Sequence, residues 1–282
     1  MVNEWAVLLQ RFRSPALDAF FYYITLFGTE WFFIAVLPIL YWTWNKKAGY
    51  RMALVFLLGE WTKNALKAAI RAPRPQPSPG AEVLHPETGP GYSFPSGHAE
   101  SSTVFWGQLA LEAKRKWVWF VATVLIALVS ISRVYMNLHW PKDILGGFVL
   151  GVILLALYNG ACAVWANLQV PFAVRLACTL IVPAGMYFCY REHDALIVIG
   201  FMIGFPVGRL LEERYLEWDE RASLPVNALK VVLGLGVLLA IRFGLKLVFP
   251  ETAAADIARY AIAGLWASFG APLVFAAFGW QR

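Results

Sequence analysis

The chain has 282 residues, of which 59% are hydrophobic and only 15% are charged. Soluble domains carry about 25% charged residues, so this composition excludes an ordinary soluble protein. Apolar runs long enough to cross roughly 30 Å of hydrocarbon as helices recur along the chain. The net charge of +6 has no accompanying basic-aromatic surface pattern, so we attribute it to loops facing an anionic leaflet and not to nucleic-acid binding.

The first segment, residues 4–27, is interrupted by the sequence RFRSP and mixes Asp18 with aromatic residues. This pattern predicts an interfacial helix or a half-membrane hairpin, not a clean span. Beyond it we expect apolar helices at about 29–44, 49–70, 97–113, 117–136, 143–166, 172–190, 195–210, 226–248 and 257–279. The predicted fold class is an all-α polytopic transmembrane helical bundle, with about eight spans plus the N-terminal segment. No cleaved signal peptide is expected.

Lysine and arginine in short loops predict which face of the membrane each loop occupies. The loops 45–51 and 112–116 are both basic, whereas the stretch 76–95 has neither lysine nor arginine. Because basic loops face the cytoplasm, the turn 71–96 should face outward. The loop 211–223 is rich in acids although it falls on the cytoplasmic side. Carboxylates weigh little in this rule, so the assignment is kept.

The first polar cluster is the sequence KAAIRAPRP at residues 67–75. Prolines 73 and 75 end the helix here. Arg71 is well explained by a basic side chain at a helix end that reaches the headgroups. Lys67 lies nearly two turns before Arg74, deeper in the apolar segment, where a charge usually faces a polar cavity or a partner.

The second cluster is PSGH at residues 95–98. Ser96 is a good N-cap, so a helix should begin at Gly97 with His98 in its first turn. The free N–H groups and the positive dipole end there favour an anion, and glycine lets it approach closely. A capping serine beside a bystander histidine is the structural alternative.

The third cluster is SRVYMNLHWPKD at residues 132–143. Arg133 ends one span, and Pro141 stands where the first residue of the next helix belongs. His139 and Asp143 are four residues apart, so the carboxylate can reach one imidazole nitrogen and orient the ring. Taken alone, a histidine near a helix cap is usually structural.

All three clusters fall on the same predicted membrane face. Cations and backbone amides suit the oxygens of a transferring phosphoryl group. One histidine held by a carboxylate suits a nucleophile, and a second histidine suits a general acid. The sequence offers no set of metal ligands, since the three cysteines lie inside apolar segments at unsuitable spacing.

The pattern resembles the type 2 phosphatidic acid phosphatase superfamily, whose signature is K-x6-R-P, then P-S-G-H, then S-R-x5-H-x3-D. Every signature position is matched, and the resemblance covers about residues 49–166. The context SGHAESSTVFWG and the extra C-terminal spans look similar to sphingosine-phosphate phosphatase-like bacterial members. We therefore divide the chain into a membrane-embedded phosphatase core, 1–166, and a transmembrane extension of unknown role, 167–282.

The resemblance implies a role for each matched residue. His139 would attack phosphorus and form a phosphohistidine, Asp143 would orient His139, and His98 would protonate the leaving group. The phosphate oxygens would be held by Lys67, Arg74, Arg133, Ser96 and the Gly97 amide. The family needs no metal and no cofactor. Glu100, one turn past His98, is open to either helix-start packing or a substrate or water contact.

The sequence therefore predicts an enzyme that hydrolyses a lipid phosphate monoester or diphosphate at the outer leaflet of a membrane. The expected location is the bacterial cell (inner) membrane, with the active site facing outside the cytoplasm. Undecaprenyl diphosphate, phosphatidylglycerol phosphate, phosphatidate and sphingoid phosphates all remain candidate substrates. The expected partner is the membrane lipid, with no nucleic acid and no obligatory protein partner. The alternative is a lipid-phosphate binding or transport protein, with or without phosphatase activity. A soluble vanadate haloperoxidase, which uses the same anion pocket, is excluded by the apolar spans.

Overall fold

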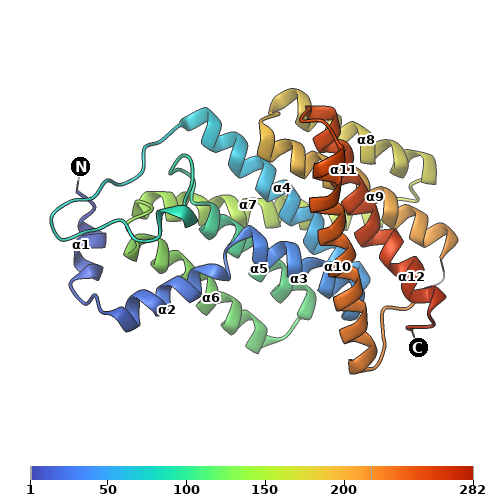
Figure 1. The fold of residues 1–282 in the computed structure, drawn as a ribbon, viewed down its shortest axis with the longest axis horizontal. Helices are drawn as coiled ribbons and strands as arrows, with labels where there is room; N and C mark the ends of the chain where they lie inside the picture. Colours follow the sequence, from blue (N-terminus) through green and yellow to red (C-terminus); the bar gives the residue numbers. More distant parts are fainter. Residues whose placement is uncertain (1, 217, 282) are drawn as a thin grey trace. The chain divides into compact units, whose positions relative to one another are not determined.

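The computed structural model describes residues 2–216 and 218–281, and helices are the only extended regular elements in this part of the chain (Figure 1). The helices in chain order are α1 (Glu4–Gln10), α2 (Pro15–Leu26), α3 (Glu30–Thr43), α4 (Lys46–Ile70), η1 (Pro86–Thr88), α5 (Gly97–Ala113), α6 (Lys116–Tyr135), α7 (Pro141–Ala166), α8 (Phe172–Cys189), α9 (His193–Tyr215), α10 (Leu224–Val248), α11 (Ala253–Leu265), η2 (Trp266–Gly270) and α12 (Ala271–Ala277). The all-α prediction is confirmed.

Each apolar helix predicted from the sequence corresponds to a helix of the structure, and the last one is divided among α11, η2 and α12. Six helices are long and apolar enough to cross a membrane, or up to seven if α2 and α3, bent by 48°, form one broken span. The expectation of about eight spans is not confirmed. The reason is local: α3 and α5 have only 14 and 17 residues, and α4 is interrupted by Glu60, Lys63 and Lys67.

The chain divides into two compact units. The first comprises residues 1–34 and 62–161, and every site residue predicted from the sequence lies in it. The second comprises 35–61 and 162–282, so it takes in a piece of the N-terminal half. The predicted functional boundary at residue 166 stays a prediction.

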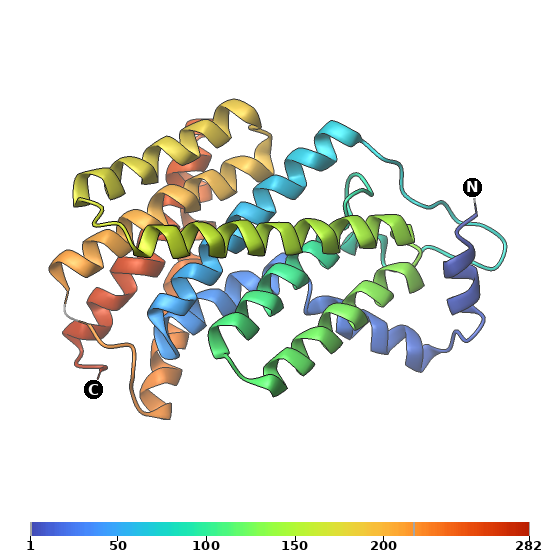
Figure 2. The same ribbon diagram turned by 180° about the vertical axis from the view of Figure 1, so that it is seen from behind.

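Within the first unit, α7 runs as one long helix (Figure 2) and packs closely on the beginning of α5. Gly147 makes this approach possible, because a Cβ atom there would collide with the carbonyl oxygen of Ser96. The Ser96 N–H in turn donates to the carbonyl oxygen of Asp143 at 3.0 Å. The start of α5 and the start of α7 are thereby fixed side by side, which brings the second and third polar clusters together.

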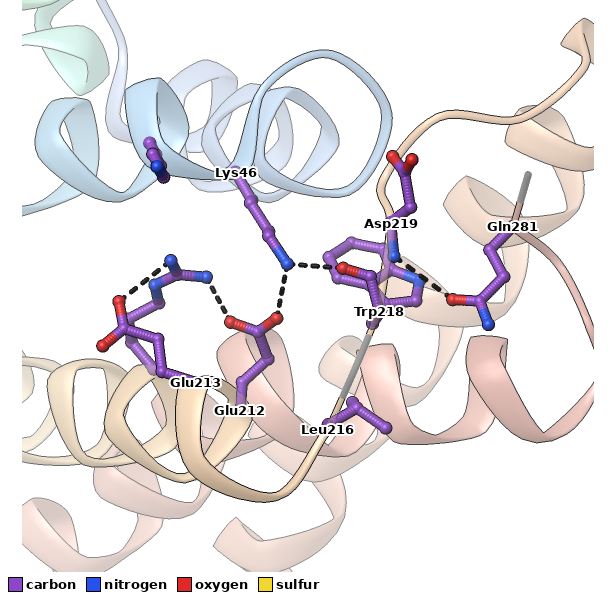
Figure 3. A pocket seen from close by; sticks show the side chains of 9 residues that line it. Lys46, Glu212, Glu213, Leu216, Trp218, Asp219 and Gln281 are labelled. Atoms are coloured by element: carbon purple, nitrogen blue, oxygen red, sulfur yellow. Dashed lines mark hydrogen bonds and ion pairs between the residues drawn. The ribbon is translucent and has the colours of Figure 1, made fainter.

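In the second unit, acidic residues near the loop 211–223, which the charge rule places on the cytoplasmic side, are paired with cations (Figure 3). Glu212, which is 1% exposed, pairs with Lys46 at 2.7 Å and also with Arg209. Glu213 pairs with Arg209 at 2.9 Å. These residues line an open cavity of about 520 Å³. The acids are thus largely neutralised by neighbouring cations; Glu217 of this loop lies outside the described residues.

Candidate active site

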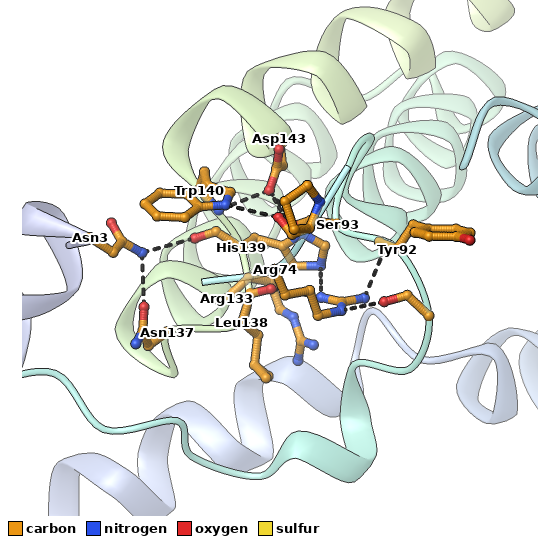
Figure 4. A network of polar contacts seen from close by, with 12 residues as sticks. Asn3, Arg74, Tyr92, Ser93, Arg133, Asn137, Leu138, His139, Trp140 and Asp143 are labelled. Atoms are coloured by element: carbon orange, nitrogen blue, oxygen red, sulfur yellow. Dashed lines mark hydrogen bonds and ion pairs between the residues drawn. The ribbon is translucent and has the colours of Figure 1, made fainter. Parts of the chain in front are cut away.

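His139 and Asp143 face each other across the start of α7 (Figure 4). Both side chains are buried, with exposures of 2% and 0%, and His139 Nδ1 lies 3.5 Å from Asp143 Oδ2. The helix begins at Pro141 because proline needs no N–H partner there. Asp143 stabilises this start by accepting the Trp140 N–H at 2.9 Å. The pairing predicted from the four-residue spacing is present, at ion-pair distance.

Ser93 lies between these two residues, and the sequence reasoning missed it. Its hydroxyl donates to Asp143 Oδ2 at 2.5 Å and lies 3.5 Å from His139 Nδ1. Ser93 is fully buried, and its N–H donates to the Ala72 carbonyl oxygen. It belongs to no spacing motif, so only the folded loop could reveal it. Asp143 is thus held in place by groups other than the histidine it faces.

Arg74 lies against the opposite nitrogen of the imidazole, with its Nη1 3.0 Å from His139 Nε2. Arg74 Nη1 also donates to the Leu138 carbonyl oxygen at 2.6 Å. The other guanidinium donors bind carbonyl oxygens of Pro90, Gly91 and Tyr92. The planar, five-donor guanidinium is therefore aimed at the imidazole edge from which an attack would start.

Arg133, the last basic residue of α6, is 0% exposed. It donates to Thr25 Oγ1 at 2.9 Å and to the carbonyl oxygen of Thr88 at 2.9 Å. A Cβ atom on Gly89 would lie 3.1 Å from Arg133 Nη2 and 3.3 Å from Arg74 Nη1. Both guanidinium groups therefore lie against the same loop residue, so the first and third clusters meet there.

Ser96, Gly97 and His98 form the start of α5, which begins at Gly97 as predicted. Ser96 is fully buried, but its side chain makes no N-cap hydrogen bond. Its Oγ and the His98 Nε2 are both buried without a hydrogen-bond partner among the described residues. Buried polar atoms are almost always paired, so these two atoms mark a place suited to a polar ligand.

Two lysines of α4 approach this region. Lys67 is half-buried, and its positive charge lowers the pKa of His139. Lys63, which the sequence reasoning missed, is 6% exposed and donates to Ser101 Oγ at 3.0 Å. Its Nζ would lie 3.4 Å from a Cβ atom on Gly97. A signal for Lys63 existed, because it precedes Lys67 by one helical turn and shares its face.

The protonation of His139 follows from its surroundings. Burial lowers the pKa of its imidazole well below the ordinary value of about 6.5, and the positive charges of Arg74, Arg133 and Lys67 lower it further. The imidazole is therefore neutral at neutral pH. With Nδ1 toward Asp143, Nε2 is the nitrogen on the Arg74 side, and it can attack an electrophile once Arg74 Nη1 turns from it to a phosphate oxygen.

Arg71, explained from the sequence as a helix-end residue, lies outside this arrangement. It is exposed and follows α4 in the left-handed conformation (φ 52°). Its Nε donates to the Ala68 carbonyl oxygen of its own helix at 3.0 Å.

Comparisons with known proteins agree with these motifs. Residues 48–167 match the family model described as PAP2 superfamily, and residues 196–282 match the PAP2 superfamily phosphatase, transmembrane extension. Phosphatidylglycerophosphatase B of Bacillus subtilis is 31% identical over 175 residues, which cover 56% of this chain and 80% of that protein.

Two longer relatives are matched over part of their length. Lipid phosphate phosphatase delta of Arabidopsis thaliana is 27% identical, over 53% of this chain and 39% of that protein. Sphingosine-1-phosphate phosphatase 2 of Mus musculus is 27% identical, over 62% of this chain and 52% of that protein. The two family matches and the extensive match to the Bacillus protein confirm the resemblance seen in the motifs: the chain belongs to the PAP2 superfamily of phosphatases.

Proposed function

We propose that this integral membrane protein hydrolyses the phosphate monoester or diphosphate of a membrane lipid through a phosphohistidine at His139. One observation carries the proposal. A buried, neutral imidazole is held between Asp143 and Arg74, in the same unit as the unpartnered Ser96 Oγ and His98 Nε2. A site with a nucleophile, cations and buried polar atoms that have no hydrogen-bond partner among the described residues suits phosphoryl transfer better than simple lipid binding.

In the first step, the His139 Nε2 lone pair attacks phosphorus and the bond from phosphorus to the leaving oxygen breaks. Burial and nearby positive charges hold the pKa of His98 well below its ordinary value, so His98 must gain a proton together with the anionic substrate before it donates that proton to the leaving oxygen. The Nδ1–H then points toward Asp143, which stabilises the positive charge growing on the ring. In the second step, a water molecule attacks the phosphohistidine and returns a proton to His98, and the N–P bond breaks to release phosphate.

The negative charge on the phosphoryl oxygens in the transition state would be stabilised by Arg74, Arg133, Lys67, Ser96 and the Gly97 N–H. In the structure the two arginines donate to carbonyl oxygens of the 88–92 loop. Phosphate oxygens would take over these donors, which costs little because one acceptor replaces another. The bidentate guanidinium geometry matches a phosphoryl group.

The substrate class follows from the depth of the site. The span α6 ends at Tyr135, and α7 begins at Pro141, so His139 lies at the boundary between hydrocarbon and water. A lipid can place its phosphate there while its tail stays among the exposed apolar side chains of α7, such as Leu145 and Phe148. The predicted basic loop 45–51 is in the structure the start of α4, but its cations, with those between α5 and α6, still favour a site outside the cytoplasm.

The test is a labelling experiment on detergent-solubilised protein. Wild type mixed with a ³²P-labelled lipid phosphate should form an acid-labile, base-stable phosphoenzyme and release phosphate. His139→Ala should do neither, while still binding phosphate through the remaining cations. Label that persists in His139→Ala would assign the nucleophile to another residue. A panel of lipid phosphates at equal surface concentration, scored by kcat/KM, would then select the substrate.

A further inference from the structure

Residues 3–10, which we call the N-terminal clamp, lie before the family match that starts at residue 48, yet they contact the His139 loop. Asn3 is 2% exposed. Its Nδ2 donates to the His139 carbonyl oxygen at 3.2 Å and to Asn137 Oδ1 at 3.1 Å (Figure 4). The backbone of the proposed nucleophile is therefore held by a side chain outside the signature motifs.

Gln10, at the other end of α1, makes a second set of contacts. It is 8% exposed, and its Nε2 donates to the Tyr135 carbonyl oxygen at 2.6 Å and to the Glu82 carbonyl oxygen at 2.9 Å. Its Oε1 accepts the Glu82 N–H at 2.8 Å. These five hydrogen bonds join the clamp to the turn 71–96, to the end of α6 or to the loop that follows α6. The clamp therefore fastens two loops of the candidate site to one helix.

The opposite face of α1 is apolar and uncovered. Trp5, Leu8 and Phe12 have exposures of 61%, 45% and 73%. Trp5 and Leu8 lie in α1, and Phe12 follows it, whereas Ala6 and Gln10 of α1 are buried and Leu9 packs against the cluster around Tyr135 and Leu138. The helix thus presents large apolar side chains to its surroundings as well as to the protein.

The contacts of the clamp fix its depth. Tyr135 is the last residue of a candidate span, and His139 precedes the first residue of the next one. A helix bonded to both carbonyl oxygens lies at the membrane boundary, where aromatic side chains are favoured at the headgroup level. The occupant that fits the uncovered face is therefore the lipid interface of the membrane that the chain spans. Arg11, the residue directly after α1, is exposed, and anionic headgroups can pair with it.

We propose that α1 is a membrane-surface anchor that positions the His139 loop, with Trp5, Leu8 and Phe12 in the lipid interface and Asn3 as a positioning residue. The proposal rests on the proposed function for its effect on catalysis, but its lipid contact is independent of any reaction. Misplacing a reacting group by about 1 Å can cost about 100-fold in rate. Loosening the clamp should therefore lower kcat more than it raises KM.

Lipid contact is tested first, without any reaction. The three native cysteines are replaced by alanine, and Leu8→Cys carries an environment-sensitive fluorophore in phosphatidylglycerol-containing vesicles. Lipids with a spin label near the headgroup should quench it more than lipids labelled deep in the chain. Ile153→Cys, exposed within the α7 span, serves as the deep reference and should show the opposite order. Absence of quenching at Leu8 by either lipid would overturn the anchor.

The positioning role is tested by kinetics in the same vesicles, with any tag at the C-terminal end. Asn3→Ala should lower kcat about 10- to 100-fold, with KM within about threefold. Asn3→Asp keeps the shape but cannot donate, so it should lose as much. The matched control is Asn159→Ala, which removes a partly buried amide pair with Gln108 far along α7. This variant should keep the wild-type kcat even if its thermal stability falls as far as that of Asn3→Ala.

The exposed apolar side chains of the clamp region have a matched control of their own. The double variant Trp5→Ser/Phe12→Ser should lower kcat, whereas Trp117→Ser/Phe120→Ser should not. The control pair has exposures of 68% and 72% and lies at the far end of α6 from Tyr135. Suppose that wild type is active and His139→Ala is inactive, but Asn3→Ala keeps the wild-type kcat. That result would overturn the positioning role and leave the proposed function standing. An inactive wild type would instead remove the proposed function.

Discussion

Ser93 connects the proposed nucleophile to its carboxylate, and its contribution can be separated from that of a serine that merely fills space. Ser93→Ala should lower kcat about 10- to 100-fold, because Asp143 loses the hydroxyl that fixes its orientation. Ser268→Ala is the matched control, since Ser268 is equally buried but lies outside the signature motifs and its hydroxyl donates only to the Gly264 carbonyl oxygen. Steady-state kinetics on both variants decides, and equal losses would mean that burial alone explains Ser93.

Three arginines near the site allow a second comparison. Arg74→Lys and Arg133→Lys keep the charge but lose the planar pair of donors, so each should lower kcat/KM about 100-fold or more. Arg71→Lys should stay within about twofold of wild type, because Arg71 is exposed and bonds only to its own helix. Equal large losses in all three variants would show that Arg71 also touches the substrate.

The lowered pKa of His139 gives a prediction about pH. Its NMR signal, from protein with isotope-labelled histidine, should titrate well below pH 6.5. The unfolded chain then binds a proton that the folded chain refuses, so stability should fall as the pH drops below about 6.5. Only four histidines are present, and His139→Gln identifies the signal. Titration at or above pH 6.5 would contradict the assignment of a neutral nucleophile.

At the scale of elements, the contact between α5 and α7 brings two sequence motifs together. Gly147→Ala places a methyl group against the Ser96 carbonyl oxygen and should separate the two helix starts. We expect a loss of about 1–3 kcal/mol in stability from overpacking, together with a fall in kcat.

A second glycine of α7 provides the control for this change. A Cβ atom on Gly160 would meet nothing within 4 Å, so Gly160→Ala should be neutral or stabilising through helix propensity. Thermal unfolding and turnover are measured in one detergent. A tolerated Gly147→Ala would mean that the helices can separate without disturbing the site.

At the scale of the whole molecule, the open question is which side of the membrane carries the chemistry. In a cysteine-free background, Pro77→Cys should react with an impermeant thiol reagent added to intact cells, and Asn167→Cys should react only after lysis. Both positions are exposed and lie outside the candidate spans. The expectation follows from the lysines and arginines at the start of α4 and between α5 and α6. The reverse labelling pattern would place the site in the cytoplasm.

The amino-acid sequence by itself determined the helical elements and most of the candidate site. Apolar runs and prolines act locally, so the start of α5 at Gly97 and of α7 at Pro141 could be predicted directly, although Ser96 makes no side-chain cap. The spacing of His139 and Asp143 also predicted their pairing, because four residues span one helical turn.

Only the tertiary structure decided which residues surround those motifs. Ser93 and Asn3 belong to no spacing pattern, and each reaches the site from a different segment. Their roles depend on side chains that meet across long sequence separations, 136 residues for Asn3 and His139. Local propensity carries no information about such pairs, because the packing of α5 on α7 and of α1 on the His139 loop creates them.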